Sequence, residues 1–255
     1  MQITGSTFIV TGGASGLGEA TARSLVYAGG NVAIFDVNDE NGQALVQEME
    51  ENALYCHVDV TDQDSVQNGV QETLQRFASV WGLVNCAGIG IPAKVLSKQG
   101  PMSLDTFQKI LGVNLVGTFN MTRLVAAQMA NNNPNAEGER GVIVNTASVA
   151  AFEGQVGQVP YAASKAGIVG MTLPLAREFA ALGIRVVSIA PGLFDTPMFG
   201  ALPDNVRESL QEQLPFPPRF GKPEEFAHLV GAIAGNPVLN GETIRLDSAM
   251  RMQPR

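Results

Sequence analysis

The sequence predicts an α/β fold in which helices cover both faces of a parallel sheet of about seven strands. Two observations predict it. Short runs rich in apolar and β-branched residues alternate with stretches of helical periodicity, and a glycine-rich turn joins the first run to the first helix. Strands that alternate with helices are joined by right-handed crossovers, so we expect them to lie parallel in a doubly wound sheet.

The elements can be placed in order along the chain. The expected strands occupy residues 7–11, 31–36, 54–58, 80–85, 141–147, 184–190 and 243–246. The expected helices occupy residues 16–28, 40–51, 62–77, 104–129 (one long helix or two short ones) and 161–181. Loops are expected at 88–102, 131–140 and 191–223, where Gly, Pro and polar residues gather. Ligands of such sheets bind beyond the carboxyl ends of the strands, so the first and third loops should rim the site.

Length and composition indicate one globular domain. Of the 255 residues, 45% are hydrophobic and 16% are charged, and no repeat or linker interrupts them. We expect a single domain over residues 1–255, with a substrate-side loop region at about 191–223. The formal net charge of −8 argues against a nucleic-acid binder, which needs clustered Lys and Arg.

The cysteine content and the terminal sequence favour a cytoplasmic location. Cys56 and Cys86 are the two cysteines, with no C-x-x-C spacing, so a reducing compartment is expected. No Cys/His cluster is present, and we expect no metal site. The first residues have no signal-peptide pattern, and the apolar runs are too short and interrupted to predict a membrane-spanning helix.

A dinucleotide site is predicted at the turn after the first strand. Gly12, Gly16 and Gly18 permit a tight turn and let backbone N–H groups approach a pyrophosphate at a helix N-terminus. The turn stands between a strand and a helix, which is the context of a Rossmann domain. A P-loop is excluded because Glu19 and Ala20 follow Gly18 instead of Lys and Ser or Thr, and a G-x-S-x-G hydrolase turn is missing.

Asp36 selects the cofactor in this interpretation. It ends the second strand, 18 residues after Gly18, where a carboxylate accepts hydrogen bonds from the adenosine ribose hydroxyls and repels a 2′-phosphate. The sequence therefore predicts NAD over NADP, with a helix N-cap as the alternative role of Asp36. Asp59 and Val60 follow the third strand and either contact the adenine or form a plain strand-end turn.

Acid–base chemistry is predicted for Tyr161. Lys165 stands four residues later on the same helical face, and an ammonium beside the phenol lowers its pKa from about 10. Ser148 follows the fifth strand, where its hydroxyl can bond a substrate oxygen as charge develops. Asn114 lies mid-helix and either bridges core groups or holds a relay water toward Lys165.

Taken together, these residues resemble the short-chain dehydrogenase/reductase family over essentially the whole chain. The matching positions fall in family order and spacing: Gly12, Gly16, Gly18, Asp59, the segment 85–88, Asn114, Ser148, Tyr161, Lys165, Pro191 and Gly192. Cys86 departs from the Ala more usual in the family. The resemblance implies a catalytic set of Asn114, Ser148, Tyr161 and Lys165. It implies that NAD is held by Gly12, Ser15, Gly16, Leu17, Gly18, Asp36, Asp59, Val60, Cys86, Ala87, Gly88, Tyr161, Lys165, Pro191, Gly192, Phe194 and Thr196.

Within the family, the segments 147–158, 189–194 and 240–254 resemble the type 2 3-hydroxyacyl-CoA dehydrogenase subgroup, also called type 10 17β-hydroxysteroid dehydrogenases. This resemblance implies NAD-dependent oxidation of an L-3-hydroxyacyl-CoA to the 3-oxoacyl-CoA in fatty acid metabolism, by a homotetramer. The alternatives are a dehydrogenase of steroids or other secondary alcohols, a 3-oxoacyl thioester reductase, and a non-catalytic NAD-binding scaffold.

The substrate contacts are less defined by the sequence. Apolar residues after Gly192 either line an acyl or steroid pocket or pack within a lid, namely Met198, Phe199, Leu202 and Phe216. Lys94 and Lys98 either recognise the phosphates of coenzyme A or are solvated surface lysines.

Overall fold

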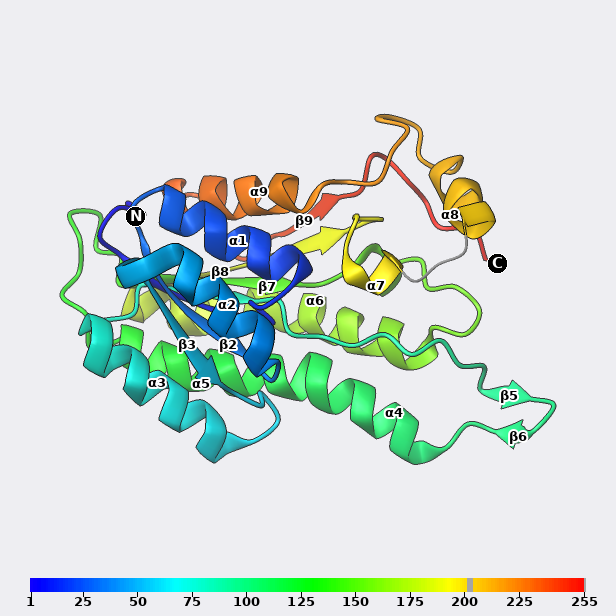
Figure 1. Ribbon diagram of the computed structural model, residues 1–255, viewed down its shortest axis with the longest axis horizontal. Coiled ribbons are helices and arrows are strands. Elements are labelled where there is room, and N and C mark those ends of the chain that lie inside the picture. Colours follow the sequence, from blue (N-terminus) through cyan, green and yellow to red (C-terminus); the bar gives the residue numbers. More distant parts are fainter. Residues whose placement is uncertain (201–203, 255) are drawn as a thin grey trace.

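A parallel seven-stranded sheet organises the part of the chain described in the computed structural model, residues 1–200 and 204–254, and its strand order is β3-β2-β1-β4-β7-β8-β9 (Figure 1). The strands are β1 (Thr7–Thr11), β2 (Asn31–Asp36), β3 (Ala53–His57), β4 (Gly82–Asn85), β7 (Gly141–Thr146), β8 (Ile184–Pro191) and β9 (Thr243–Leu246). Every neighbouring pair is parallel. The predicted α/β fold is confirmed.

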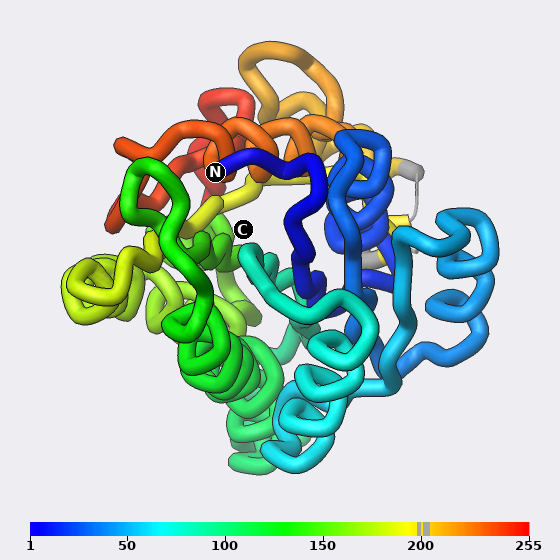
Figure 2. The backbone as a smooth tube through the Cα atoms, turned by 90° about the vertical axis from the view of Figure 1, so that its left-hand side faces the viewer, coloured from blue at the N-terminus to red at the C-terminus, as the bar shows by residue number. Residues whose placement is uncertain are grey.

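Helices cover both faces of the sheet. They are α1 (Gly16–Tyr27), α2 (Asp39–Met49), α3 (Gln63–Phe77), α4 (Leu104–Leu111), α5 (Thr118–Met129), α6 (Val159–Phe179), α7 (Pro197–Gly200), α8 (Asp204–Gln211) and α9 (Pro223–Gly235), with short segments η1 (Glu50–Asn52), η2 (Gly112–Gly117), η3 (Val149–Ala151) and η4 (Ala180–Leu182). Helices α1, α2 and α9 lie on one face, and α3, α5 and α6 lie on the other (Figures 1 and 2).

Successive side chains of the strands point alternately into two apolar cores, one on each face of the sheet. In β1, Phe8 and Val10 pack toward α1 and α9, whereas Ile9 packs toward α3 and α5. Each of these side chains is at most 1% exposed. A strand buried on both faces reads as a continuous apolar run, and this is why the sequence predicts the strands so well.

Three departures from the sequence prediction concern helices and loops. Helix α9 was not expected, although Pro223 at its first position, Glu224 and Glu225 in its first turn, and apolar Phe226 and Val230 are typical of a helix start and a buried face. Short helices α7 and α8 interrupt the expected loop 191–223. A small hairpin of β5 (Leu96–Ser97) and β6 (Gly100–Pro101) projects from the expected loop 88–102 (Figure 1).

The expected helix 104–129 is one continuous helix with a π-helical turn, η2, between α4 and α5. By length and composition alone, Leu104–Met129 could cross a membrane, which the sequence analysis did not expect of any segment. Half of its most apolar stretch is buried inside the fold. Met121, Val125 and Met129 supply much of this burial against the sheet.

Candidate active site

A cleft of about 660 Å³ opens at the carboxyl ends of the strands. It spans the edge from β3 to β8, with the neighbouring strands β1 and β4 near its middle. From β1 the chain proceeds outward to β2 and β3, then returns to β4 on the other side. Such a reversal leaves a crevice between the two halves of the sheet, which is where ligands of doubly wound folds bind.

The glycine-rich turn after β1 is shaped by close backbone contacts. Gly12 has a φ of +60°, and a Cβ there would lie 2.7 Å from the backbone nitrogen of Ala87. A Cβ on Gly18 would collide with the carbonyl oxygen of Gly12. Ser15 caps α1 in extended conformation with no hydrogen bond from its side chain. The turn is thus a backbone cradle at a helix N-terminus, and it fits a pyrophosphate.

Carboxylates follow β2 and β3 at one end of the cleft. Asp36 accepts hydrogen bonds from the backbone N–H of Ala14 and of Asn38, each at 3.0 Å. These bonds hold its carboxylate against the glycine-rich turn. Asp59 caps its own turn through Thr61, whose N–H and hydroxyl donate to it at 2.9 and 2.7 Å. Both residues line the cleft.

The segment after β4 forms the floor of the cleft. The backbone N–H of Ala87 donates to Thr11 Oγ1 at 3.1 Å, and the thiol of Cys86 accepts the Thr146 hydroxyl at 3.5 Å. Burial raises the pKa of Cys86 to about 11, so it acts as a small apolar side chain. On the far side, the backbone N–H of Gly192 donates to Leu246 at 2.9 Å, which joins the end of β8 to β9.

Ser148 and Tyr161 meet in the cleft from different elements. Ser148 follows β7, and its Oγ accepts the N–H of Ala150 at 3.1 Å. This bond occupies the oxygen and leaves the hydroxyl proton to be donated. Burial raises the pKa of Tyr161 above its usual value, and a hydrogen bond with Ser148 opposes that rise. The sequence analysis expected the Lys165 ammonium to dominate the pKa of Tyr161 and to lower it. The ammonium lies 5.7 Å from the centre of the Tyr161 ring, and burial has the larger effect on this pKa.

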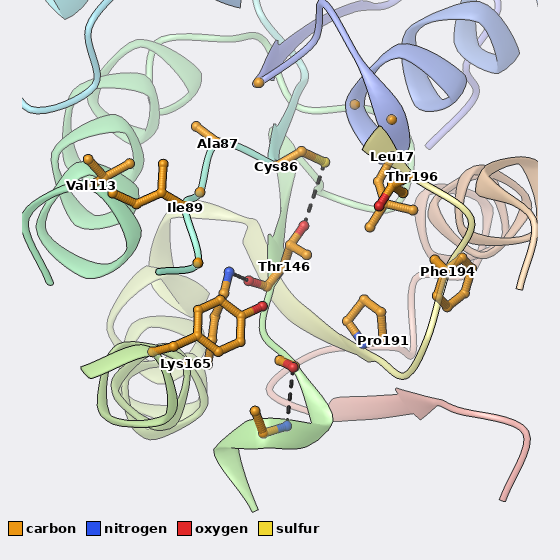
Figure 3. Close-up of a pocket in the computed structure, with 18 of the residues that line it drawn as sticks. Leu17, Cys86, Ala87, Ile89, Val113, Thr146, Lys165, Pro191, Phe194 and Thr196 are labelled. Atoms are coloured by element: carbon orange, nitrogen blue, oxygen red, sulfur yellow. Dashed lines mark hydrogen bonds between the residues drawn. The ribbon is translucent and has the colours of Figure 1, made fainter. Parts of the chain in front are cut away.

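Lys165 lines the cleft and is almost fully buried. Its Nζ donates to the Thr146 carbonyl at 2.7 Å, and Figure 3 shows Thr146 between Lys165 and Cys86. Only 4% of Lys165 is exposed. Burial lowers the pKa of Lys165 to about 8, since the ammonium loses most of its hydration there.

Asn114 lies in the π-helical turn η2, next to Lys165. Its side chain accepts the N–H of Ile89 at 2.8 Å and donates to the Ile89 carbonyl and to Ser164 at 2.9 and 3.0 Å. A Cβ on Gly88 would lie 3.3 Å from Asn114 Oδ1 and 3.6 Å from Lys165 Nζ, so the two groups flank the same glycine. Asn114 therefore joins η2, the β4 loop and α6. Single π turns inside α-helices often occur at functional sites.

Comparison with known proteins identifies the family. Residues 6–207 match the short chain dehydrogenase family. The chain is 52% identical over 255 residues to the 3-hydroxyacyl-CoA dehydrogenase type-2 of Homo sapiens, covering 99% of this chain and 98% of that protein. It is 49% identical to the protein of the same name from Drosophila melanogaster, covering 99% and 100%. The crystal structure of 3-hydroxyacyl-CoA dehydrogenase type-2 from Mycobacterium avium matches with a TM-score of 0.95 and 40% identity over 98% of both chains.

The chain belongs to the short-chain dehydrogenase family. It is accordingly an oxidoreductase, and membership implies a nicotinamide cofactor. The backbone cradle at Gly12 and Gly18 and the carboxylate of Asp36 are the features of this structure that fit a dinucleotide.

Nearly all residues that the short-chain dehydrogenase resemblance singled out line the same cleft; Asn85 and Asn114 are the exceptions, and Asn114 lies just behind it, beside Gly88. The loops 88–102 and 191–223 contribute to the wall as expected, but the sequence analysis did not single out the following residues of the wall, several of them apolar: Val37, Ile89, Ile91, Pro92, Val113, Thr146, Val149, Ala150, Gln155, Gly157, Gln158, Leu193, Leu210 and Met252. The position of Ile89 directly after the 85–88 segment could have indicated one of them. Nothing local marks Leu210 or Met252.

Of the substrate-side residues predicted from the sequence, Phe216, Lys94 and Lys98 lie outside the cleft wall. Phe216 is 80% exposed and does not line the cleft, so the structure does not support the pocket role among the two roles that the sequence left open for it. Leu202 and the side chains of Met198 and Phe199 lie outside what the structure describes. Lys94 and Lys98 are exposed, beside and within the β5–β6 hairpin, and outside the cleft wall.

Proposed function

We propose that this short-chain dehydrogenase uses NAD to oxidise an L-3-hydroxyacyl-CoA reversibly to the 3-oxoacyl-CoA. One observation carries the proposal: Ser148, Tyr161 and Lys165 meet between a dinucleotide cradle and an apolar wall within one cleft. The names of the relatives point to the same substrate class.

The choice of NAD over NADP rests on Asp36. Its carboxylate stands against the glycine-rich turn, held by the N–H groups of Ala14 and Asn38. A ribose hydroxyl can donate to such a carboxylate, whereas a 2′-phosphate would meet like charge. The next residue is Val37, which supplies no compensating cation.

The bound nicotinamide supplies the acceptor or donor of hydride, and the chain supplies binding and proton movement. In ketone reduction, the Tyr161 phenol donates its proton to the substrate oxygen; in oxidation, the phenolate takes it back. Its raised pKa keeps the phenol protonated at neutral pH, ready to donate. The Ser148 hydroxyl, whose oxygen is held by Ala150, donates to the negative charge on the phenolate or the substrate oxygen.

Lys165, which lines the cleft, and Asn114, which lies behind it, support this proton transfer. The Lys165 ammonium bonds the Thr146 carbonyl and, while charged, favours the phenolate of Tyr161. We propose that it also binds the nicotinamide ribose. Asn114 fixes the loop at Ile89 beside it and could exchange protons with Lys165 through a water.

An acyl chain suits the other end of the cleft. Val149, Leu193, Leu210 and Met252 line it, and they belong to or pack against one apolar cluster around Met250. Apolar walls with few polar groups are typical of sites for acyl chains and steroids.

The test is NADH oxidation by the purified protein with acetoacetyl-CoA, beside NADPH and a panel of CoA-free ketones and steroids. We expect turnover with NADH and the thioester to exceed every other pair. Turnover with CoA-free ketones alone would reject the thioester while keeping the Tyr161 chemistry. Dinucleotide binding without any turnover would favour a non-catalytic scaffold.

Two wider parts of the proposal rest on family resemblance and sequence composition. We propose that the enzyme is a homotetramer, which light scattering on a size-exclusion column checks. We propose a cytoplasmic location, which fractionation of the source cells checks.

A further inference from the structure

After β9, the chain turns back toward the cleft through two consecutive left-handed residues. Ser248 and Ala249 have φ angles of 55° and 60°, a backbone conformation that is unfavourable for residues with a Cβ. Asp247 holds the turn, since its Oδ1 accepts the Ala249 N–H at 3.1 Å and its carbonyl accepts the Met250 N–H at 2.9 Å. Such strain persists only where the surroundings determine the conformation, and it gathers at ligand-binding sites.

The turn delivers two methionines to the substrate end. Met250 is 1% exposed and belongs to a cluster with Val149, Leu193, Leu214 and Phe220. Met252 packs on this cluster, is partly exposed, and lines the cleft. A flexible thioether side chain fills irregular space well, so it suits a wall that meets chains of varying shape.

Glu153 fastens this tail to the loop between Ser148 and Tyr161. Its two carboxylate oxygens accept Arg245 Nη1 at 2.9 Å and Nη2 at 3.2 Å, a two-pronged pairing. The second oxygen also accepts the backbone N–H of Met252 at 3.2 Å. The bond with Arg245 holds the pKa of Glu153 below its usual value, so the carboxylate stays charged at neutral pH.

Further contacts brace the tail itself and join it to the loop. Within the tail, Arg245 Nε donates to Asp247 at 2.7 Å and its Nη2 to the Met250 carbonyl at 3.2 Å. Gln155 Nε2 donates to the Gln253 carbonyl at 2.8 Å, and the N–H of Val156 donates to Pro254 at 3.1 Å. Figure 1 shows the tail running from β9 to the end of the molecule where α8 lies.

We propose that Met252 determines which acyl chains the site accepts, and that Glu153 is the positioning residue that keeps Met252 in the wall. This inference rests on the proposed function for its substrates. The acyl chain extends past Ser148 toward Val149 and meets Met252 at the end of its path. Glu153 touches neither substrate nor cofactor; it acts through the backbone N–H of Met252.

The experiment compares kcat/KM for acetoacetyl-CoA and 3-oxooctanoyl-CoA with NADH in wild type, Met252→Ala, Glu153→Gln and the double variant. Shortening Met252 lengthens the pocket, so we expect the long-to-short ratio to rise about fivefold or more, because one methylene in an apolar pocket changes discrimination by about 10-fold or more. Glu153→Gln should shift the ratio in the same direction but less, mainly through KM. In the double variant, Glu153→Gln should not change the ratio further, since Glu153 acts on the ratio only through Met252.

Glu48→Gln is the matched control, because Glu48 pairs with Arg23 at 2.8 Å on the surface, away from the cleft wall. It should leave the ratio unchanged, and NADH affinity should be unchanged in all variants. Met252→Leu, which keeps the volume, should behave as wild type and guards against misfolding of the alanine variant. A ratio in Met252→Ala that falls or stays within twofold of wild type overturns the inference. If wild type turns over no thioester, the proposed function fails, and the same ratio measured on a short and a long ketone still tests Met252.

Discussion

The two ends of the cleft are built in opposite ways. At the dinucleotide end, the contacts are made by backbone: Gly12 approaches the backbone of Ala87, Gly18 approaches that of Gly12, and Asp36 bonds backbone N–H groups. At the substrate end, side chains from distant segments meet. Glu153 is 92 residues from Arg245 and 99 from Met252, and both pairs are joined by hydrogen bonds.

This difference predicts which residues tolerate substitution: few at the dinucleotide end and more at the substrate end. A backbone cradle leaves no room for a Cβ, so nearly any replacement of its glycines disturbs cofactor binding. A wall of side chains can be reshaped by single substitutions that leave the backbone in place. We therefore expect cofactor recognition in this enzyme to be rigid and substrate recognition to be adjustable. The predictions below test that contrast, beginning at the chemistry that the two ends share.

The largest effect is expected for Tyr161→Phe, which removes the hydroxyl where the two ends meet. General acid–base catalysis contributes about 10²–10⁴ in rate, so we expect kcat for ketone reduction to fall by about three orders of magnitude. NADH affinity, followed by fluorescence, should change less than about threefold, because the cradle is untouched. Residual activity above a tenth of wild type would remove Tyr161 from its role.

Gly12→Ala should damage the dinucleotide end alone. Its Cβ would lie 2.7 Å from the backbone nitrogen of Ala87, at a φ of +60°. We expect NADH affinity to weaken by about tenfold or more and the free energy of unfolding to drop by about 1–3 kcal/mol, as for other overpacked sites. Gly235→Ala is the control, since nothing lies within 4 Å of a Cβ there. Equal losses in both variants would contradict a specific role for the cradle.

The same contrast explains what the sequence could and could not predict. The glycine turn, Asp36 and the Tyr161–Lys165 pair have local signatures, since strand–turn–helix geometry and helical spacing fix their neighbours. Residues from separate segments have none: Leu210 and Met252 reach the cleft only because α8 and the tail fold back onto it. The raised pKa of Tyr161 was missed for a related reason, because burial depends on the whole fold and spacing shows only the lysine.

The pH dependence should differ between the two directions of the reaction. Burial holds the pKa of Tyr161 above its usual value, so oxidation needs loss of a proton that is bound at neutral pH. Above about pH 6, we expect kcat/KM for 3-hydroxybutyryl-CoA oxidation to rise about tenfold per pH unit. Over the same pH values, kcat/KM for the reduction should stay constant. Ser148→Ala should move the oxidation profile to higher pH, since the Ser148 hydrogen bond lowers this pKa. A profile that moves to lower pH would contradict the assignment.

Asp36→Asn should alter cofactor choice with little effect on substrate. Asparagine keeps an oxygen to accept from Ala14 or Asn38 but removes the charge that repels a 2′-phosphate. We expect the preference for NADH over NADPH, as a ratio of kcat/KM, to fall by about tenfold, the size of a modest electrostatic contribution. KM for acetoacetyl-CoA should be unchanged. An unaltered preference would mean that another group discriminates between the cofactors.

The smallest effect concerns the outer rim of the substrate end. Lys94 and Lys98 are exposed near the β5–β6 hairpin, and the hypothesis from sequence is that they attract the phosphates of coenzyme A. Exposed charge pairs contribute about 0.2–1 kcal/mol, so replacing both lysines by Ala should raise KM for acetoacetyl-CoA by about two- to fivefold. A CoA-free ketone should keep its KM, and added salt should erase the difference. Equal changes in KM for both substrates would mean that the lysines stabilise the hairpin and do not bind coenzyme A. A rise in KM for acetoacetyl-CoA alone would mean that the side chains that recognise the substrate reach from Met252 out to the hairpin.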